Sequence, residues 1–252
     1  MAYSKLAYIY DILMDDAPYD DWQAFVQSMV NKYLPHANKM LDLGCGTGEL
    51  SNRFTTLGYQ VTGVDYSEDM LAYAQEQSNK LQHRVHYIQQ DIRLLNGLSG
   101  FDVSICLCDV LNYIVTEEDV RSVFNNAYKS LKVDGLFMFD VHSIKHMEES
   151  LANQTFAEIY DDVSYVWFCE KGEEIGEVIH DLTFFIQEDG NKYERFDEIH
   201  HQRTFSVEIY KQLLKEAGFT LLSMHTDFSM EQDVTPENGE RIFFVCQKQE
   251  SK

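Results

Sequence analysis

The stretch Lys39-Met-Leu-Asp-Leu-Gly-Cys-Gly-Thr-Gly-Glu-Leu50 decides the fold of this chain. Its apolar start, Met40 to Leu43, predicts a buried strand, and the glycines that follow predict a sharp turn. Apolar residues at helical spacing from Leu50 to Leu57 then predict a helix that ends at Gly58. Such a turn brings backbone close to a ligand, because glycine has no Cβ to hold the ligand away. The pattern indicates a nucleotide cofactor.

The charge around this turn indicates which kind of nucleotide binds. A dinucleotide fingerprint requires glycine at position 49, where Glu49 stands, and a phosphate-binding P-loop requires a lysine that is absent here. Asp42 adds an acid inside the first predicted strand, and Asp65 and Asp91 add acids at the ends of the next two. Together these acids repel a pyrophosphate and attract a sulfonium cofactor. The helix N-terminus still suits the carboxylate of such a cofactor. An NAD enzyme is therefore disfavoured.

The sequence L-D-L-G-C-G-T-G at residues 41–48 resembles the glycine motif of class I S-adenosylmethionine-dependent methyltransferases. Four further segments resemble that family's motifs in order, and they are Val61–Asp65, Ile88–Ile92, Phe101–Asp109 and Leu131–Val141. Residues 10–22 resemble the YqeM-like branch of the family. The resemblance implies an α/β fold with a doubly wound, mostly parallel, seven-stranded Rossmann-like sheet. It also implies S-adenosyl-L-methionine as the cofactor.

The resemblance further implies which residues contact the cofactor. They come from the glycine turn, the end of the next strand with the helix behind it, and the ends of two later strands. The expected set is Asp42, Gly44, Cys45, Gly46, Gly48, Asp65, Tyr66, Met70, Asp91, Ile92 and Cys108. Asp65 is expected to accept hydrogen bonds from both ribose hydroxyls, with a plain helix cap as the alternative. Asp91 is expected to accept from the adenine amino group, with an ordinary turn as the alternative.

Methyl transfer is an in-line displacement, so the protein mainly has to align the acceptor, and a base is needed only if the acceptor must lose a proton. Candidate side chains follow the strands 101–109 and 136–141, and they are Asp109, Asn112, Tyr113 and His142. Asp140 is expected to point away from them. A hydrogen-bonded structural histidine is the alternative for His142. The family resemblance adds Tyr10, so the catalytic candidates are Tyr10, Asp109 and His142.

The chain is expected to have three parts. Residues 1–35 predict a helical lid, residues 36–150 and 206–252 the methyltransferase core, and residues 151–205 an inserted antiparallel β meander. The meander is marked by strand-like runs at 163–169, 178–187 and 193–205 and by an Asp-Gly hairpin signal. It covers either the substrate or a second subunit, which would make a homodimer. A metal or base cluster of His146, His180, His200 and His201 is an open alternative, but no metal site is expected.

Composition limits the partners. The chain has 252 residues and a formal net charge of −22, with 42 acidic residues against 20 basic ones. Such a surface repels nucleic acids and anionic membranes. No apolar run is long enough to span a membrane and no signal-peptide core is visible, so a cytoplasmic location is expected.

These observations favour a methyltransferase that modifies an oxygen or nitrogen of a small molecule. Two alternatives remain open. One is a non-catalytic sensor or interaction protein that binds S-adenosylmethionine or S-adenosylhomocysteine. The other is an RNA or protein methyltransferase.

Overall fold

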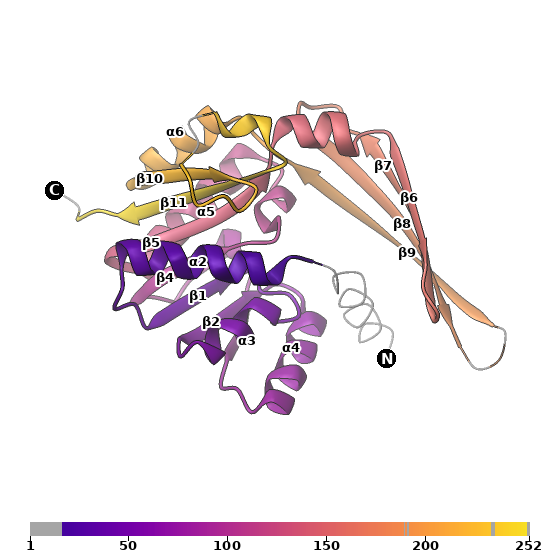
Figure 1. Cartoon of the computed structure of the whole chain (residues 1–252), viewed down its shortest axis with the longest axis horizontal. Coiled ribbons are helices and arrows are strands. Elements are labelled where there is room, and N and C mark those ends of the chain that lie inside the picture. Colours follow the sequence, from indigo (N-terminus) through magenta and orange to yellow (C-terminus); the bar gives the residue numbers. More distant parts are fainter. Residues whose placement is uncertain (1–16, 189, 191, 233–234, 251–252) are drawn as a thin grey trace.

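The computed structural model describes residues 17–188, 190, 192–232 and 235–250, which form two β-sheets with helices around the larger one (Figure 1). The larger sheet has seven strands in the order β10-β11-β5-β4-β1-β2-β3. These strands are β1 (Lys39–Leu43), β2 (Gln60–Asp65), β3 (His86–Gln89), β4 (Phe101–Cys106), β5 (Leu131–His142), β10 (Phe219–Thr226) and β11 (Arg241–Lys248). Strand β11 runs antiparallel to both of its neighbours, and the remaining pairs are parallel. The predicted doubly wound, mostly parallel sheet is confirmed.

Helices cover both faces of this sheet. They are α2 (Tyr19–Tyr33), α3 (Glu49–Thr56), α4 (Glu68–Leu81), α5 (Glu117–Ser130) and α6 (Val207–Ala217). Helices α5 and α6 pack on one face, and α2 and α3 pack on the other. Strand β5 shows the consequence: Phe137 and Phe139 join the first layer, while Leu136 and Met138 join the second. Side chains alternate along a strand, so a strand buried on both faces is apolar at almost every position.

The helix starts differ in a way that matters for ligand binding. Helices α4, α5 and α6 each begin with a hydroxyl side chain that accepts a backbone hydrogen bond, and these caps are Ser67, Thr116 and Ser206. Helix α3 follows Gly48 directly and has no side-chain cap. Its first amide groups are therefore not satisfied by a cap of its own.

Residues 154–203 form the second sheet, which extends away from the first in Figure 1. Its four antiparallel strands are β6 (Gln154–Ile159), β7 (Val163–Lys171), β8 (Glu177–Gln187) and β9 (Tyr193–Arg203), in that order. The predicted meander is confirmed for β7, β8 and β9, but β6 was missed. Strand β6 lies at the sheet edge with five of its six side chains exposed, so no alternation of burial marks it. The division into lid, core and insert remains our proposal.

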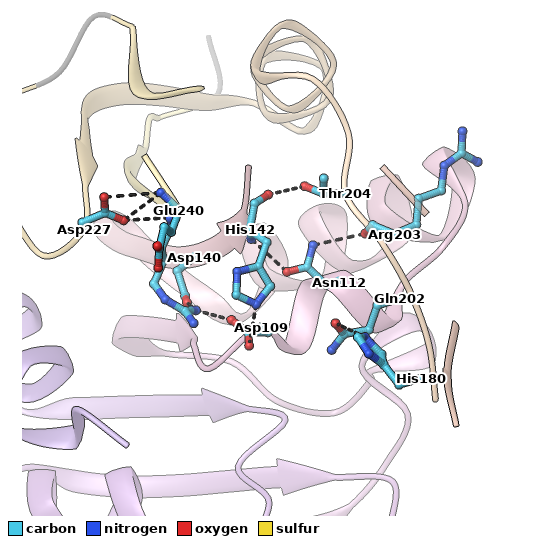
Figure 2. Close-up of polar contacts among 11 residues, drawn as sticks. Asp109, Asn112, Asp140, His142, His180, Gln202, Arg203, Thr204, Asp227 and Glu240 are labelled. Carbon is cyan, nitrogen blue, oxygen red and sulfur yellow. Dashed lines mark hydrogen bonds and ion pairs between the residues drawn. The ribbon is translucent and has the colours of Figure 1, made fainter. Parts of the chain in front are cut away.

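Two buried side chains fasten the second sheet to the first (Figure 2). Asn112, in the 3₁₀ turn η2 (Val110–Tyr113), donates its Nδ2 to the carbonyl of Arg203 at 3.2 Å. The Oδ1 of Asn112 accepts the backbone N–H of His142 at 3.0 Å. Thr204 adds a hydrogen bond from Oγ1 to the carbonyl of His142 at 2.6 Å. The end of β9 is thus held where β4 and β5 end.

Candidate active site

The glycine turn folds over the end of β2. The N–H groups of Gly44 and Cys45 both donate to the carbonyl of Val64, at 2.7 and 3.0 Å. Gly46 has a left-handed backbone with φ of 51°, and a Cβ at this position would meet no atom within 4 Å. Its open side therefore faces free space, which is what close approach of a ligand to the backbone requires.

Asp65 ends β2 beneath this turn, as predicted. One carboxylate oxygen accepts the N–H of Gly46 at 2.9 Å, and the other accepts the N–H of Ser67 at 2.9 Å. Burial raises the pKa of Asp65, and these backbone donors oppose the rise. The two carboxylate oxygens have four acceptor sites, and the backbone N–H groups of Gly46, Ser67 and Tyr66 use up to three of them, so at least one remains for a hydroxyl donor. The ribose role remains a prediction that this geometry permits.

Asp42 is a second buried acid beside the turn. Ser51 donates its hydroxyl to Asp42 at 2.6 Å from the first turn of α3. Burial raises the pKa of Asp42 to about 7, because the charged form loses its hydration and Ser51 compensates only in part. A positively charged ligand in the pocket would favour the ionised form. Asp42 therefore suits a sulfonium or ammonium group.

A pocket lies between the turn and the segment that follows β4. It is lined by three groups of residues: Tyr19 of α2; the turn and helix start with Asp42, Gly44, Cys45, Gly46, Thr47, Glu49 and Leu50; and Leu107, Cys108 and Val110 after β4. Burial raises the pKa of the Cys45 and Cys108 thiols well above the ordinary value, so both stay neutral. These residues fit S-adenosylmethionine: open backbone at Gly46, carboxylates for the cation and ribose, and uncapped amides at α3.

The remaining predicted cofactor residues lie around the next strand ends. Asp91 accepts the N–H of Arg93 and also pairs with the Arg93 side chain, at 2.6 to 3.0 Å. The plain turn considered as its alternative is thus present, and the adenine contact remains a prediction. Ile92 is buried in the main core. Tyr66 is 78 % exposed, and Met70 is partly exposed in the first turn of α4.

A charged cluster lies where β4, β5 and β11 meet (Figure 2). His142 Nε2 lies 3.0 Å from Asp109 Oδ2, so the predicted catalytic pair is brought together. Arg241, which opens β11, contacts both Asp109 and Asp140. Burial would raise the pKa of Asp109, but His142 and Arg241 lower it below its ordinary value. Asp109 is therefore a stable carboxylate that orients its neighbours and takes up no proton.

The prediction that Asp140 points away from this site was wrong. Asp140 and His142 are two residues apart on β5, so they share a face, and Arg241 joins Asp140 to Asp109. The role of Arg241 was missed altogether. Its guanidinium also lies 4.8 Å from the ring centre of Trp22, which links α2 to the site. The one available signal was its position as the polar first residue of an apolar final strand.

Backbone strain is concentrated beside the cluster. Cys108 and Asp109 both have positive φ, of 58° and 63°, although neither is glycine. Consecutive residues of this kind persist only where their surroundings enforce them, and they are frequent in functional sites. The strain turns the chain after β4 so that Cys108 and Val110 line the pocket while Asp109 meets Arg241.

The histidine cluster left open by the sequence does not form among the described residues. No group of three or more histidine, cysteine or acidic side chains in that part of the chain could hold a metal. His142 and His146 stack with ring centres 4.7 Å apart, His180 binds Gln202, and His201 contacts Glu177. Tyr10 lies outside the described residues, so its role stays a prediction.

The site combines an open glycine turn, the carboxylates of Asp42 and Asp65 beside it, and a charged cluster at the ends of β4 and β5. This combination is that of the class of S-adenosylmethionine-dependent methyltransferases. Comparisons with known proteins agree. Residues 40–135 match a family described as a methyltransferase domain. YqeM of Bacillus subtilis (strain 168), provisionally named a methyltransferase, is 42% identical over 250 residues, which cover 98% of each chain. The chain therefore belongs to the YqeM-like branch of the class I S-adenosylmethionine-dependent methyltransferases.

Two further comparisons bear on the fold and on the acceptor. The crystal structure of an S-adenosylmethionine-dependent methyltransferase from Clostridium acetobutylicum ATCC 824 superposes with a TM-score of 0.88 and 29% identity, covering 99% of this chain and 100% of that one. A glycine/sarcosine N-methyltransferase of Halorhodospira halochloris is 27% identical over 236 residues, which cover 89% of this chain and 82% of that protein. The cofactor predicted from the sequence is thereby confirmed as S-adenosyl-L-methionine. Among the described residues, none of the helices combines the length and apolarity needed to cross a membrane.

Proposed function

We propose that this chain transfers the methyl group of S-adenosylmethionine to a nitrogen of a small amine. The observation that carries the proposal is the charge of the cluster beside the pocket. Asp140, which is buried, and Asp109, which is partly buried, are two carboxylates that share one cation, Arg241, which leaves an excess of negative charge. Such a site attracts an ammonium group and repels a phosphate. The overall charge of −22 acts in the same direction.

The relatives support nitrogen as the acceptor atom. The relative from Halorhodospira halochloris is named for N-methylation of glycine and sarcosine, both small amines, and it aligns with most of this chain. That breadth matters because the alignment extends beyond the cofactor motifs into the segments that follow β5. We therefore favour nitrogen over oxygen, which the sequence alone left open.

The described residues suggest a division of roles. S-adenosylmethionine supplies the methyl group as the electrophile, so the protein has to present a neutral amine in line with it. The Nε2–H of His142 donates to Asp109, which leaves Nδ1 as the basic nitrogen of the ring. That atom is buried and has no hydrogen-bond partner among the described residues. In our proposal His142 takes up the proton that the amine loses, and Asp109 stabilises the resulting imidazolium.

The test is incubation with methyl-labelled S-adenosylmethionine and a matched panel. The amines are glycine, sarcosine, ethanolamine and 2-phenylethylamine. The comparison arms are 2-phenylethanol and glycolate, which replace the amine by a hydroxyl, together with total tRNA and a cell-extract fraction below 1 kDa. Mass spectrometry locates the label. Label on nitrogen supports the proposal, and label on oxygen, on RNA or on protein contradicts it.

The non-catalytic alternative is tested in the same experiment. A sensor would bind S-adenosylmethionine without forming S-adenosylhomocysteine in any arm. Product formation with His142→Ala reduced at least tenfold, and cofactor binding unchanged, would exclude the sensor and support the catalytic role of His142.

A further inference from the structure

A line of hydrogen bonds crosses the second sheet on one face. Trp167 of β7 donates its Nε1–H to Nδ1 of His180 on β8 at 3.0 Å. Because Nδ1 accepts, the neutral ring carries its hydrogen on Nε2, which donates to Oε1 of Gln202 on β9 at 3.0 Å. Burial lowers the pKa of His180 to about 4, so the ring stays neutral. Gln202 is left with its amide nitrogen as a donor beyond the edge of the sheet.

Tyr113 stands at the end of this line. It is the last residue of η2, three positions after Val110 of the cofactor pocket. The Gln202 side chain lies next to its hydroxyl, and the ring of His200 packs edge-on against it with centres 5.8 Å apart. Partial burial and the charge of Asp109 raise the pKa of Tyr113 to about 12, so the phenol keeps its proton. Tyr113 is nevertheless 46% exposed, so a ligand can reach it.

The position of Tyr113 is fixed from both sides. Asn112, the residue before it, is fully buried and binds the backbone at the ends of β5 and β9. Gln202, also buried, approaches it from β9. Tyr113 is therefore a partly exposed side chain between the cofactor pocket and the second sheet, with its backbone fixed through Asn112 and its ring packed against His200. Sites that align a reactant need this combination of access and rigidity.

We propose that Tyr113 binds the methyl acceptor, and that the second sheet serves catalysis by holding its hydroxyl through Gln202, His180 and Trp167. The inference rests on the proposed function and names a residue for it. In this proposal the amide nitrogen of Gln202, whose Oε1 is engaged by His180, donates to the phenol oxygen, and that oxygen keeps a second lone pair that accepts an N–H of the amine. The amine is thereby rotated so that its own lone pair is directed at the methyl group. Gln202, His180 and Trp167 are positioning residues, because they act through Tyr113.

Tyr113→Phe removes the hydroxyl and keeps the ring. With the panel amine that wild type methylates fastest as the probe, we expect its KM to rise at least tenfold, while the Kd for S-adenosylmethionine changes less than twofold. Gln202→Leu should raise KM in the same direction by a smaller factor. The double variant should be no worse than Tyr113→Phe alone, because Gln202 has nothing to position once the hydroxyl is gone. A purely structural role for Gln202 would instead give multiplied effects.

Tyr193→Phe is the matched control. Tyr193 lies on the other face of β9 and is 55% exposed, so the same chemical change there should leave KM unaltered. An unchanged KM in Tyr113→Phe, with wild type active on an amine, overturns this inference and leaves the proposed function standing. Multiplied effects in the double variant overturn the positioning role. If wild type instead methylates only a component of the extract fraction, the atom that carries the label decides the amine proposal, and the same variants assayed at half-saturating extract decide the role of Tyr113.

Discussion

Asp42→Asn should make the free protein more stable while weakening cofactor binding. The carboxyl of Asp42 is fully buried, and burial raises its pKa from 3.8 to about 7. A folded-state pKa above the unfolded one means that the folded state resists ionisation. Stability is therefore highest below the unfolded pKa and falls as pH rises from about 4 to about 7. Asparagine has the same shape and cannot ionise.

The magnitude follows from the two pKa values. A difference of one in pKa corresponds to about 1.4 kcal/mol, so ionised Asp42 costs the folded state about 4 kcal/mol above pH 7. Asparagine keeps an acceptor for Ser51 but adds an amide donor, and an unsatisfied donor costs about 1–3 kcal/mol. The net gain at pH 8 should be about 1–3 kcal/mol. The difference in the free energy of unfolding between variant and wild type should increase by between about 2 and 3 kcal/mol from pH 5 to pH 8. This increase does not depend on the pH-independent effect of the substitution.

The assay is urea unfolding of both proteins at pH 5, 6, 7 and 8 without ligand. Asp181→Asn, on an exposed strand position, is the control and should track wild type at every pH. Calorimetry with S-adenosylmethionine at pH 8 should show the opposite ranking, with the variant weaker at least tenfold, because the cofactor's cation loses its buried counter-charge. A stability gap that is the same at all four pH values would refute the reasoning, since it would show that Asp42 does not titrate near pH 7.

Three further outcomes are expected. Asp65→Ala should weaken S-adenosylmethionine binding at least tenfold, because hydrogen bonds to a charged group contribute about 1.5–3 kcal/mol each. Asp65→Asn should bind with intermediate affinity, and the control Asp69→Ala should bind normally. Equal affinities of wild type and Asp65→Ala by calorimetry would disprove the ribose assignment. Gly44→Ala should abolish cofactor binding or unfold the protein, as measured by calorimetry and circular dichroism. The reason is that the added Cβ would lie 2.4 Å from a Val110 methyl group, at a position where φ is 75°. A fully active variant would show that the turn is placed wrongly. Replacing residues 154–202 by a short flexible linker should change the cofactor affinity, measured by calorimetry, by less than about threefold. The same change should abolish turnover, measured by labelling, or dimerisation, measured by light scattering. Full activity in the same oligomeric state would exclude both roles for the insert.

The part of the fold that sequence could predict is the part with local signals. The glycine turn, the end of β2 at Asp65 and the cap at Ser67 all lie within a few residues of the pattern that marks them. The placement of Asp109 and His142 at one edge of the sheet also followed, because the parallel strands β4 and β5 have their carboxyl ends there, but the contact between the two side chains was not predicted. These predictions needed only strand direction and order, which the five motifs supply.

Local sequence patterns do not predict two features of the second sheet, its strand β6 and the contacts between its strands. Strand β6 has neither alternation nor β-branched runs, since as an exposed edge it has no buried face to encode. The line from Trp167 through His180 and Gln202 to Tyr113 joins residues of three antiparallel strands and a distant turn. Its members are ordinary polar residues in their own segments. Only the strand register, which hairpin lengths set, brings them to one face.

The error over Asp140 has a different cause. Residues two apart on a strand share a face, so the expectation that Asp140 points away from His142 misapplied the alternation along β5. Burial of Asp140 beside a second carboxylate also requires a counter-ion. The missing information was its counter-ion, Arg241, 101 residues further along the chain. Strand β11 runs antiparallel to β5, so its first residue reaches the carboxyl end of β5, where a parallel strand would have brought its last. The reversed final strand thus brings a cation to the edge of the sheet where the acids gather, and this cation lets the buried Asp140 and the partly buried Asp109 lie together next to the cofactor pocket.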